Sequence, residues 1–324
     1  MLLDRVDPFA NGPLEAMTIR PRAADTSSAI DRPRRRFLVV RNRHAGLAKA
    51  RLVTSVAVAL EAQGATVDVA ETHSPDEVAL LFKACEHLDA IVAAGGDGTI
   101  RALALAMHAQ GLDLPLGIIP AGTGNVLAHE IELPRSPERI AATLLSGPVR
   151  RAHVATANGT PFLLMCGSGF DAQILLRLSV SLKQRVGRAA YTGPTLKTFV
   201  EPAVSPFKVV IDGAAHTATW IVVANASRYA GSFIVAPAAS IFDKQLYAVL
   251  FKATTRRGRF SEMLALASGR IERCKTVEII PCTTVGIEAP PLTPSQLDGD
   301  AFGFGPVEIA TTGTTVPLIV PTRN

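Results

Sequence analysis

The stretch Ile91-Val92-Ala93-Ala94-Gly95-Gly96-Asp97-Gly98-Thr99-Ile100 joins a run of apolar residues to a glycine-rich turn. A short continuous apolar run predicts a buried strand, and the residues that follow the turn favour a helix. Glycines let a backbone approach a ligand closely, and the N–H groups at a helix start attract anions such as phosphate. This stretch therefore predicts an anion-binding strand–turn–helix unit, although by itself it leaves open a tight turn without a ligand.

Two further loops follow predicted strands in the same way. Pro120-Ala121-Gly122-Thr123-Gly124-Asn125 comes after an apolar run at residues 116–119, and Asn42-Arg43-His44-Ala45-Gly46 comes after another at residues 37–40. The carboxyl ends of neighbouring parallel strands meet at one edge of a sheet, where ligands bind. Neither a P-loop motif nor a dinucleotide-binding GxGxxG motif is present. The three loops predict a nucleotide crevice of another kind.

The wider pattern predicts two domains. Strands expected at residues 37–40, 65–70, 88–94 and 116–119 alternate with helices that begin near residues 47, 75, 99 and after 125. Such alternation is typical of a parallel sheet covered on both faces. Beyond about residue 147, turn residues separate strand-like runs at 162–166, 207–211, 219–224, 246–251, 276–280, 307–310 and 316–320, with helices expected at 187–200 and 258–268.

We therefore expect an α/β plus β fold: a doubly wound N-terminal α/β domain with a C-terminal antiparallel β-sandwich domain. The expected boundaries are a mobile tail over residues 1–32, a nucleotide-binding domain over 33–148 and the sandwich over 149–324. The tail is expected because its Pro, Gly, Ala, Ser and Thr residues show no apolar periodicity.

Composition excludes several classes. The 324 residues are 48% hydrophobic and 19% charged, with a net charge of +5, and no apolar run reaches the roughly 18 residues of a membrane helix. No leader pattern is visible, so the sequence predicts a soluble, cytoplasmic protein. Four cysteines without a CxxC pair predict reduced, mostly buried thiols. The cluster Arg32-Pro33-Arg34-Arg35-Arg36 is either a solvated lead-in to the first strand or a basic arm for an anionic membrane, and no nucleic-acid-binding surface is expected.

Together these motifs resemble the diacylglycerol-kinase catalytic domain that bacterial lipid kinases share with diacylglycerol, sphingosine and ceramide kinases. The GGDGT loop followed by the PxGTxN loop is highly specific to that group. Further matches are residues 167–172, the basic stretch 183–191, residues 225–231 ahead of Ala236-Pro237, and Leu297-Asp298-Gly299-Asp300. The resemblance covers the chain from about residue 36 onward. It implies that the last segment returns towards the N-terminal domain.

The resemblance also implies a site for ATP and Mg²⁺. The implied ATP-binding residues are Asn42, Arg43, His44, Ala45, Gly46, Thr72, Gly95, Gly96, Asp97, Gly98, Thr99, Ile100, Arg101, Gly122, Thr123 and Asn125. The implied Mg²⁺ ligands are Ser240, Asp243 and the backbone carbonyl of Gln245, although Asp243 alternatively serves a surface turn. The implied catalytic residues are Asp300, as the base, and Asp97, as a second carboxylate that assists it or holds water on the magnesium.

Several positions depart from the family pattern. Arg43 replaces the usual proline of the first loop, Arg101-Ala102 replaces Asn-Glu, Val126 replaces an aspartate, and Asp300 replaces a glutamate. The shorter Asp300 shortens the reach of the base. Arg101 is expected either to grip a phosphate or to be a solvated helix side chain.

The sequence thus predicts an ATP-dependent lipid kinase that phosphorylates diacylglycerol or a related long-chain alcohol through peripheral contact with a membrane. Two alternatives stay open: an NAD-kinase-like enzyme with a soluble substrate, and a catalytically weak nucleotide- or lipid-binding homologue. The identity of the acceptor and the oligomeric state do not follow from the sequence.

Overall fold

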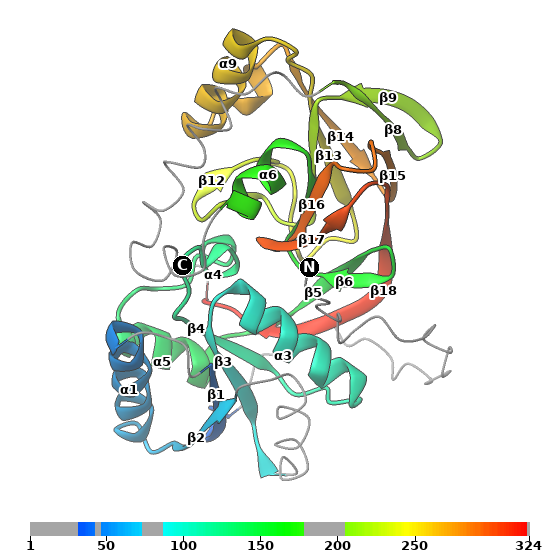
Figure 1. The fold of residues 1–324 in the computed structure, drawn as a ribbon. Coiled ribbons are helices and arrows are strands. Elements are labelled where there is room, and N and C mark those ends of the chain that lie inside the picture. Colours follow the sequence, from blue (N-terminus) through cyan, green and yellow to red (C-terminus); the bar gives the residue numbers. More distant parts are fainter. Residues whose placement is uncertain (1–31, 43–46, 73–86, 178–204, 323–324) are drawn as a thin grey trace, which may run out of the picture.

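A computed structural model describes residues 32–42, 47–72, 87–177 and 205–322. The N-terminal part is built on parallel strands in the order β2 (Thr66–Thr72), β1 (Arg36–Asn42), β3 (Ala90–Gly95) and β4 (Leu116–Pro120) (Figure 1). Every residue of β3 is buried. A central strand that is covered on both faces reads as a continuous apolar run, which is why the sequence locates it well.

Helices cover both faces of these strands. Helices α1 (Leu47–Glu61) and α5 (Pro137–Ser146) close one face, and α3 (Asp97–Ala109) closes the other. The helix predicted after residue 125 is two helices, because α4 (Val126–Glu130) ends before a new start at Ser136, whose hydroxyl accepts a hydrogen bond from Arg139 N. Serine at the cap followed by proline is a strong helix start.

The C-terminal part consists of antiparallel strands. The smaller sheet has the order β14 (Val277–Cys282), β13 (Leu246–Phe251), β10 (Trp220–Ala224), β7 (Met165–Ser168), β16 (Pro294–Leu297) and β17 (Asp300–Phe304). It packs on the antiparallel part of the larger sheet, which contains β18 (Val307–Ile319), β15 (Thr284–Glu288), β8 (Phe207–Ile211), β9 (Ala214–Ala218), β5 (Val149–Ala157) and β6 (Thr160–Phe162). Buried side chains of both sheets, such as Phe162 and Leu250, form one core between them. The predicted fold class is confirmed.

Strand β18 corrects one prediction. The expected strands at 307–310 and 316–320 are a single strand whose register shifts between Thr311 and Thr315. A local irregularity of this kind absorbs the Gly313 region, which the sequence suggested was a turn. Near its end, Leu318 pairs in parallel with Leu116 of β4, while its first half pairs with β15. The last strand therefore joins the parallel strands to the sandwich in one continuous sheet.

The predicted strand at 162–166 is also wrong. Strand β6 ends at Phe162 and β7 begins at Met165, because the intervening N–H groups donate to the side chain of Asp298. The remaining elements are α6 (Phe170–Arg177), β11 (Arg228–Tyr229), β12 (Phe233–Ile234), α9 (Arg256–Ala267) and the short helix η3 (Ile271–Arg273). The predicted features at residues 1–31, 43–46, 75, 183–191 and 187–200 lie outside the described residues.

Arg34 is a structural residue and not part of a free basic arm. Its guanidinium donates to the carbonyls of Leu144 and Gly147, both at 2.9 Å, and the side chain is buried. Burial lowers the pKa of Arg34 to about 10. Arg34 therefore ties the start of β1 to the end of α5.

The described thiols agree with the expectation from composition. Cys166 and Cys282 are buried and unbonded, and Cys274 is partly buried. Across the ranges described, no helix is both long and apolar enough to cross a bilayer.

Candidate active site

The predicted loops lie at one edge of the parallel strands. Asn42 at the end of β1 pairs with Thr72 at the end of β2, and Gly95 at the end of β3 pairs with Pro120 at the end of β4. The amide of Ala121 continues this pairing by donating to the carbonyl of Gly95 at 2.9 Å. The glycine loop after β3 (residues 95–99) and the glycine loop after β4 (residues 120–125) thus leave the sheet side by side, as the strand order predicts.

The two loops touch through their backbones. A Cβ built on Gly122 would lie 2.3 Å from the Cα of Gly96, a distance that real side chains do not tolerate. Asn125 shapes the second loop from a left-handed conformation (φ 47°), since its Oδ1 accepts from Gly122 N at 2.7 Å and its Nδ2 donates to Gly122 O at 3.2 Å. Glycine at 122 is therefore required for this contact, and a Cβ on Gly96 would be crowded at 3.1 Å from the Cα of Gly122.

Asp97 joins the 95–99 loop to helix α4, which follows the 120–125 loop. Its Oδ2 accepts from Val126 N at 3.0 Å and its Oδ1 accepts from Leu127 N at 2.9 Å. A carboxylate at the amino end of a helix satisfies N–H groups that have no partner inside the helix. Burial nevertheless raises the pKa of Asp97, although these two hydrogen bonds oppose the shift. Both carboxylate oxygens of Asp97 are thus occupied by α4.

Helix α4 continues this connection into the sandwich. Glu130, its last residue, accepts from Ser227 Oγ at 2.7 Å and from Arg228 N at 3.1 Å. Helix α4 therefore connects the glycine loops, through Asp97 at its start, with the segment that leads into β11, through Glu130 at its end.

Helix α3 begins two residues before the expected start near residue 99. Its first residue is Asp97 and its cap is Gly96. The Thr99 side chain lies over Gly95, where an added Cβ would meet it at 2.5 Å. Ile100 is buried in the core, and its amide donates to Gly96 O at 3.1 Å. Thr123 in the second loop is partly buried.

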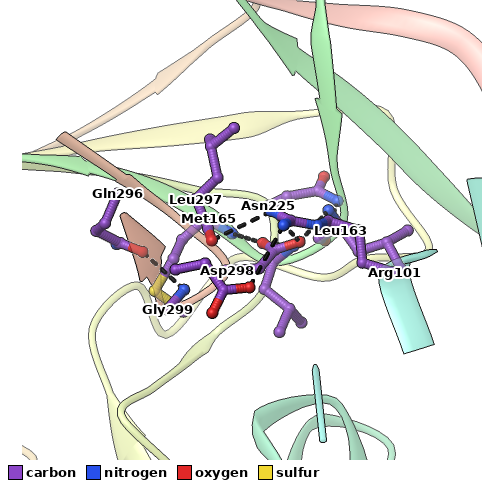
Figure 2. A network of polar contacts seen from close by, with 10 residues as sticks. Arg101, Leu163, Met165, Asn225, Gln296, Leu297, Asp298 and Gly299 are labelled. Carbon is purple, nitrogen blue, oxygen red and sulfur yellow. Dashed lines mark hydrogen bonds and ion pairs between the residues drawn. The ribbon is translucent and has the colours of Figure 1, made fainter. Parts of the chain in front are cut away.

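The segment from Leu297 to Asp300 reaches this site from the sandwich. Asp298 adopts a left-handed conformation (φ 50°) and its side chain is 1% exposed. Its carboxylate accepts from the amides of Leu163, Leu164 and Met165 at 3.0, 2.8 and 3.0 Å (Figure 2). Burial raises the pKa of Asp298, against the opposing effects of Arg101 and of these amides. Asp298 is therefore the buried anchor of the segment.

In contrast to the buried Asp298, Asp300 lies in a solvent-exposed environment. Its side chain is 54% exposed, and its Oδ2 lies 2.8 Å from the position that a Cβ on Gly98 would take. Arg101 holds the same segment, because its Nη1 donates to Leu297 O at 3.2 Å and its Nη2 donates to Asp300 Oδ2 at 3.4 Å. The Arg101 side chain is only 20% exposed, so its interpretation as a solvated helix residue is wrong.

A buried polar connection supports this segment from behind, and the sequence did not reveal it. Gln296 accepts from Gly299 N at 2.8 Å and donates to Asp171 Oδ2 at 3.2 Å (Figure 2 shows the first contact). Burial raises the pKa of Asp171 to about 6. Gly167 leaves the space for it, since a Cβ there would lie 2.0 Å from Asp171 Oδ2. The motif at 167–172 had signalled its importance, but its partner at Gln296 carries no sequence signal.

The predicted magnesium ligands lie together on the turn before β13. Asp243 N donates to Ser240 O at 3.0 Å, Ser240 Oγ accepts from Phe242 N at 3.3 Å, and the side chains of Asp243 and Gln245 are exposed. Hydroxyl, carboxylate and carbonyl oxygens suit Mg²⁺, which keeps several waters. Within the described ranges, no group of three or more His, Cys, Asp or Glu side chains could hold a metal. The magnesium site therefore stays a prediction that rests on a single carboxylate.

Comparison with protein families matches both halves of the chain. Residues 36–157 match the diacylglycerol kinase catalytic domain, and residues 165–320 match the YegS C-terminal NAD kinase β-sandwich-like domain. The chain belongs to the diacylglycerol kinase family. Family membership identifies it as a kinase, the class of enzyme that the resemblance implied.

Individual relatives of this kinase are distant. A Staphylococcus carnosus protein named "putative lipid kinase" is 25% identical over 236 residues, which cover 71% of this kinase and 76% of the relative. An uncharacterized Synechocystis protein is 26% identical over 241 residues, which cover 72% of this kinase and 55% of that longer relative. A Bacillus anthracis crystal structure, named a "putative diacylglycerol kinase", superposes with a TM-score of 0.72 at 21% identity, covering 89% and 98% of the two chains. This last likeness shows that the fold is shared.

Proposed function

We propose that this kinase transfers the γ-phosphate of ATP to the hydroxyl of diacylglycerol or of a related long-chain lipid alcohol. One observation carries the proposal: the carboxylate of Asp300 stands against Gly98 in the first turn of α3, beside the paired glycine loops. An acid for the acceptor hydroxyl and a cradle for phosphates thus meet at one place, although they are about 200 residues apart in the chain.

The glycine loops support nucleotide binding through their backbones. The contact between Gly96 and Gly122 leaves no side chain between the loops, and the start of α3 directs N–H groups outward. We infer that ATP phosphates bind along the first turn of α3. The loop residues that the sequence predicted would surround these phosphates. The predicted contributions of residues 43–46 lie outside the described residues.

We assign the base to Asp300 and not to the other carboxylates. Asp97 and Asp298 each use both oxygens to accept backbone N–H groups, whereas Asp300 is exposed and shares one oxygen with Arg101. Asp300 would accept the proton of the lipid hydroxyl while that oxygen forms a bond to the γ-phosphorus and the bond to the ADP oxygen breaks. Asp97 would act as a positioning residue that keeps the two loops in register.

Mg²⁺ bound with ATP would neutralise phosphate charge. For a further Mg²⁺ ion, the protein ligands that we propose are Ser240, Asp243 and the carbonyl of Gln245. The lipid acceptor implies peripheral contact with a membrane surface.

One observation favours a second candidate, a nucleotide-binding homologue with weak turnover. The Oδ2 of Asp300 already accepts a hydrogen bond from Arg101 Nη2 at 3.4 Å, so only its other oxygen is free to accept the proton of the lipid hydroxyl. The NAD-kinase-like alternative has only the name of the C-terminal domain behind it, whereas relatives such as the Staphylococcus carnosus protein are named lipid kinases.

A direct assay separates the three functions. The folded protein is incubated with Mg²⁺, γ-labelled ATP and mixed micelles that contain diacylglycerol, ceramide or a total lipid extract, with NAD in a parallel reaction. Label in an organic-phase product supports the proposal, and label in NADP supports the alternative. ATP binding by calorimetry with no labelled product in any reaction supports the weak homologue and contradicts the proposal.

A further inference from the structure

Helix α9 presents an unusual outer face. Phe260 is 63% exposed and Leu264 is 58% exposed, although both are large apolar residues. They are four residues apart, so they lie on the same side of the helix, one turn from each other. Figure 1 shows α9 at the outer end of the sandwich, far from the parallel strands. An apolar pair at such a position favours a contact outside this chain.

The inner side of the helix explains why this face points outward. Glu262 is fully buried, and its Oε1 accepts from Lys252 N at 3.1 Å and from Ala253 N at 2.9 Å. Burial raises the pKa of Glu262, which marks the cost of placing a carboxylate there. These hydrogen bonds fix the rotation of α9 about its axis. A carboxylate is thus held inside while Phe260 and Leu264 are held outside.

The segment that carries this face is strongly basic. From residue 255 to residue 275, the exposed charged side chains are Arg256, Arg257, Arg270, Arg273 and Lys275 against one acid, Glu272. Arg256 and Arg257 stand in the first turn of α9, where the helix dipole disfavours positive charge. The helix dipole therefore gives these two charges no stabilisation at this end of α9, and their sign suits an anionic partner.

The face is also connected to the candidate active site. Strand β12 packs against α9 and carries Phe233, which is 36% exposed. Its hairpin partner β11 begins at Arg228, whose amide donates to Glu130 at the end of α4. A chain of direct contacts thus leads from α9 through the hairpin to the helix that Asp97 braces.

We propose that Phe260 and Leu264 of α9, with Arg257 and the basic residues around them, form a docking face for an anionic lipid bilayer. A helix with apolar side chains on its outer face and basic side chains beside them binds such an interface by inserting the first and attracting headgroups with the second. The inference deepens the proposed function, since it names the surface through which this kinase would reach a lipid substrate. It replaces the Arg32–Arg36 arm, in which Arg34 is buried.

Cosedimentation with vesicles tests the docking face without any turnover. The full chain is mixed with vesicles of phosphatidylglycerol and phosphatidylcholine, or of phosphatidylcholine alone, at low and high salt. We expect binding to the anionic vesicles that weakens with salt, a loss of about tenfold or more in the double variant Phe260→Ser, Leu264→Ser, and a smaller loss in Arg257→Glu. Matched controls are Val58→Ser, 57% exposed on α1, and Arg139→Glu, exposed on α5.

Three results would overturn this proposal: no binding of the wild type to anionic vesicles, equal losses in the double variant and in Val58→Ser, or a wild-type dimer that the double variant converts to a monomer. The last result would assign the face to a second copy of the chain. Activity distinguishes this failure from failure of the proposed function. The double variant should lose activity on long-chain diacylglycerol in vesicles and keep it on a dispersed short-chain diacylglycerol, whereas a protein that phosphorylates neither lipid fails as a kinase even if it binds vesicles.

Discussion

Arg101 and Asp300 face each other at 3.4 Å across the junction between α3 and the 297–300 segment. Arg101 also donates to Leu297 O and lies 4.0 Å from Asp298. In the kinases that this chain resembles, position 101 is usually Asn. In this chain it is Arg101, whose side chain holds the proposed base. We propose that Arg101 acts on the reaction through Asp300, as a positioning residue.

Replacing Arg101 separates positioning from phosphate binding. We expect Arg101→Ala to lower kcat by about tenfold to a hundredfold while the KM for ATP changes little, because the base loses its fixed place. Arg101→Lys should recover part of the loss, since it keeps the charge but not the two-point contact. Steady-state kinetics over pH 5–9 checks this. A rise in the KM for ATP at constant kcat would instead show that Arg101 binds phosphate.

Substitution of Gly98 tests whether the position of the Asp300 side chain matters for activity. An added Cβ would lie 2.8 Å from Asp300 Oδ2, so Gly98→Ala should displace the end of that side chain. We expect kcat to fall by roughly tenfold or more with little change in thermal stability, since the atom that must move is the tip of an exposed side chain. The control is Gly313→Ala, where an added Cβ meets nothing within 4 Å. Equal activity in the two variants would place the base elsewhere.

Asp97 should behave as a structural brace. Asp97→Ala removes the acceptor of two α4 amides, and loss of such a cap costs about 0.5–2 kcal/mol of the free energy of unfolding. We expect lower stability and weaker binding of a non-hydrolysable ATP analogue together, with Asp97→Asn in between because it retains one acceptor oxygen. Urea unfolding and calorimetry measure the two effects. A variant with normal stability and normal ATP affinity but no turnover would restore Asp97 to a catalytic role.

Asp171 should make stability depend on pH. Its pKa is about 6 in the folded protein and about 4 in an unfolded chain, so between these values the folded state holds a proton that the unfolded state has released. The stabilisation from this group is therefore full below pH 4 and is lost as the pH rises through 6. Relative to Asp171→Asn, which does not ionise, the wild type should lose roughly 2 kcal/mol of its free energy of unfolding between pH 4 and 7. A constant difference across this range would contradict the raised pKa.

Sequence reasoning located the features that depend on local pattern. The buried run 88–94, the two glycine loops and the strand 207–211 each carry an apolar or glycine signal of their own, and each lies where it was expected. Predictions failed where distant residues decide the local structure. Asp298 ends β6 by binding three amides more than 130 residues away, and β18 pairs with β5 on both sides of Gly313, so one strand runs past this glycine.

In the candidate site too, residues marked by a motif were predicted, whereas contacts that depend on distant residues were not. Asp300 was predicted from a motif, and the structure places its side chain beside Gly98. Its role as the base stays a prediction. The contacts of Arg101 and the Asp171–Gln296–Gly299 connection depend on how the sandwich packs against α3, and no spacing in the sequence encodes that packing.

The most direct test of the account is the rate of lipid phosphorylation by Asp300→Asn, measured with labelled ATP and mixed micelles. The side chain is 54% exposed, so we expect normal folding and normal ATP affinity but a rate that is about 10²–10⁴ times lower, as the loss of a general base predicts. Asp300→Glu should retain activity, and Asp113→Asn, another exposed carboxylate paired with an arginine, should match the wild type. A folded Asp300→Asn protein that phosphorylates lipid at the wild-type rate would contradict the assignment of Asp300 as the base.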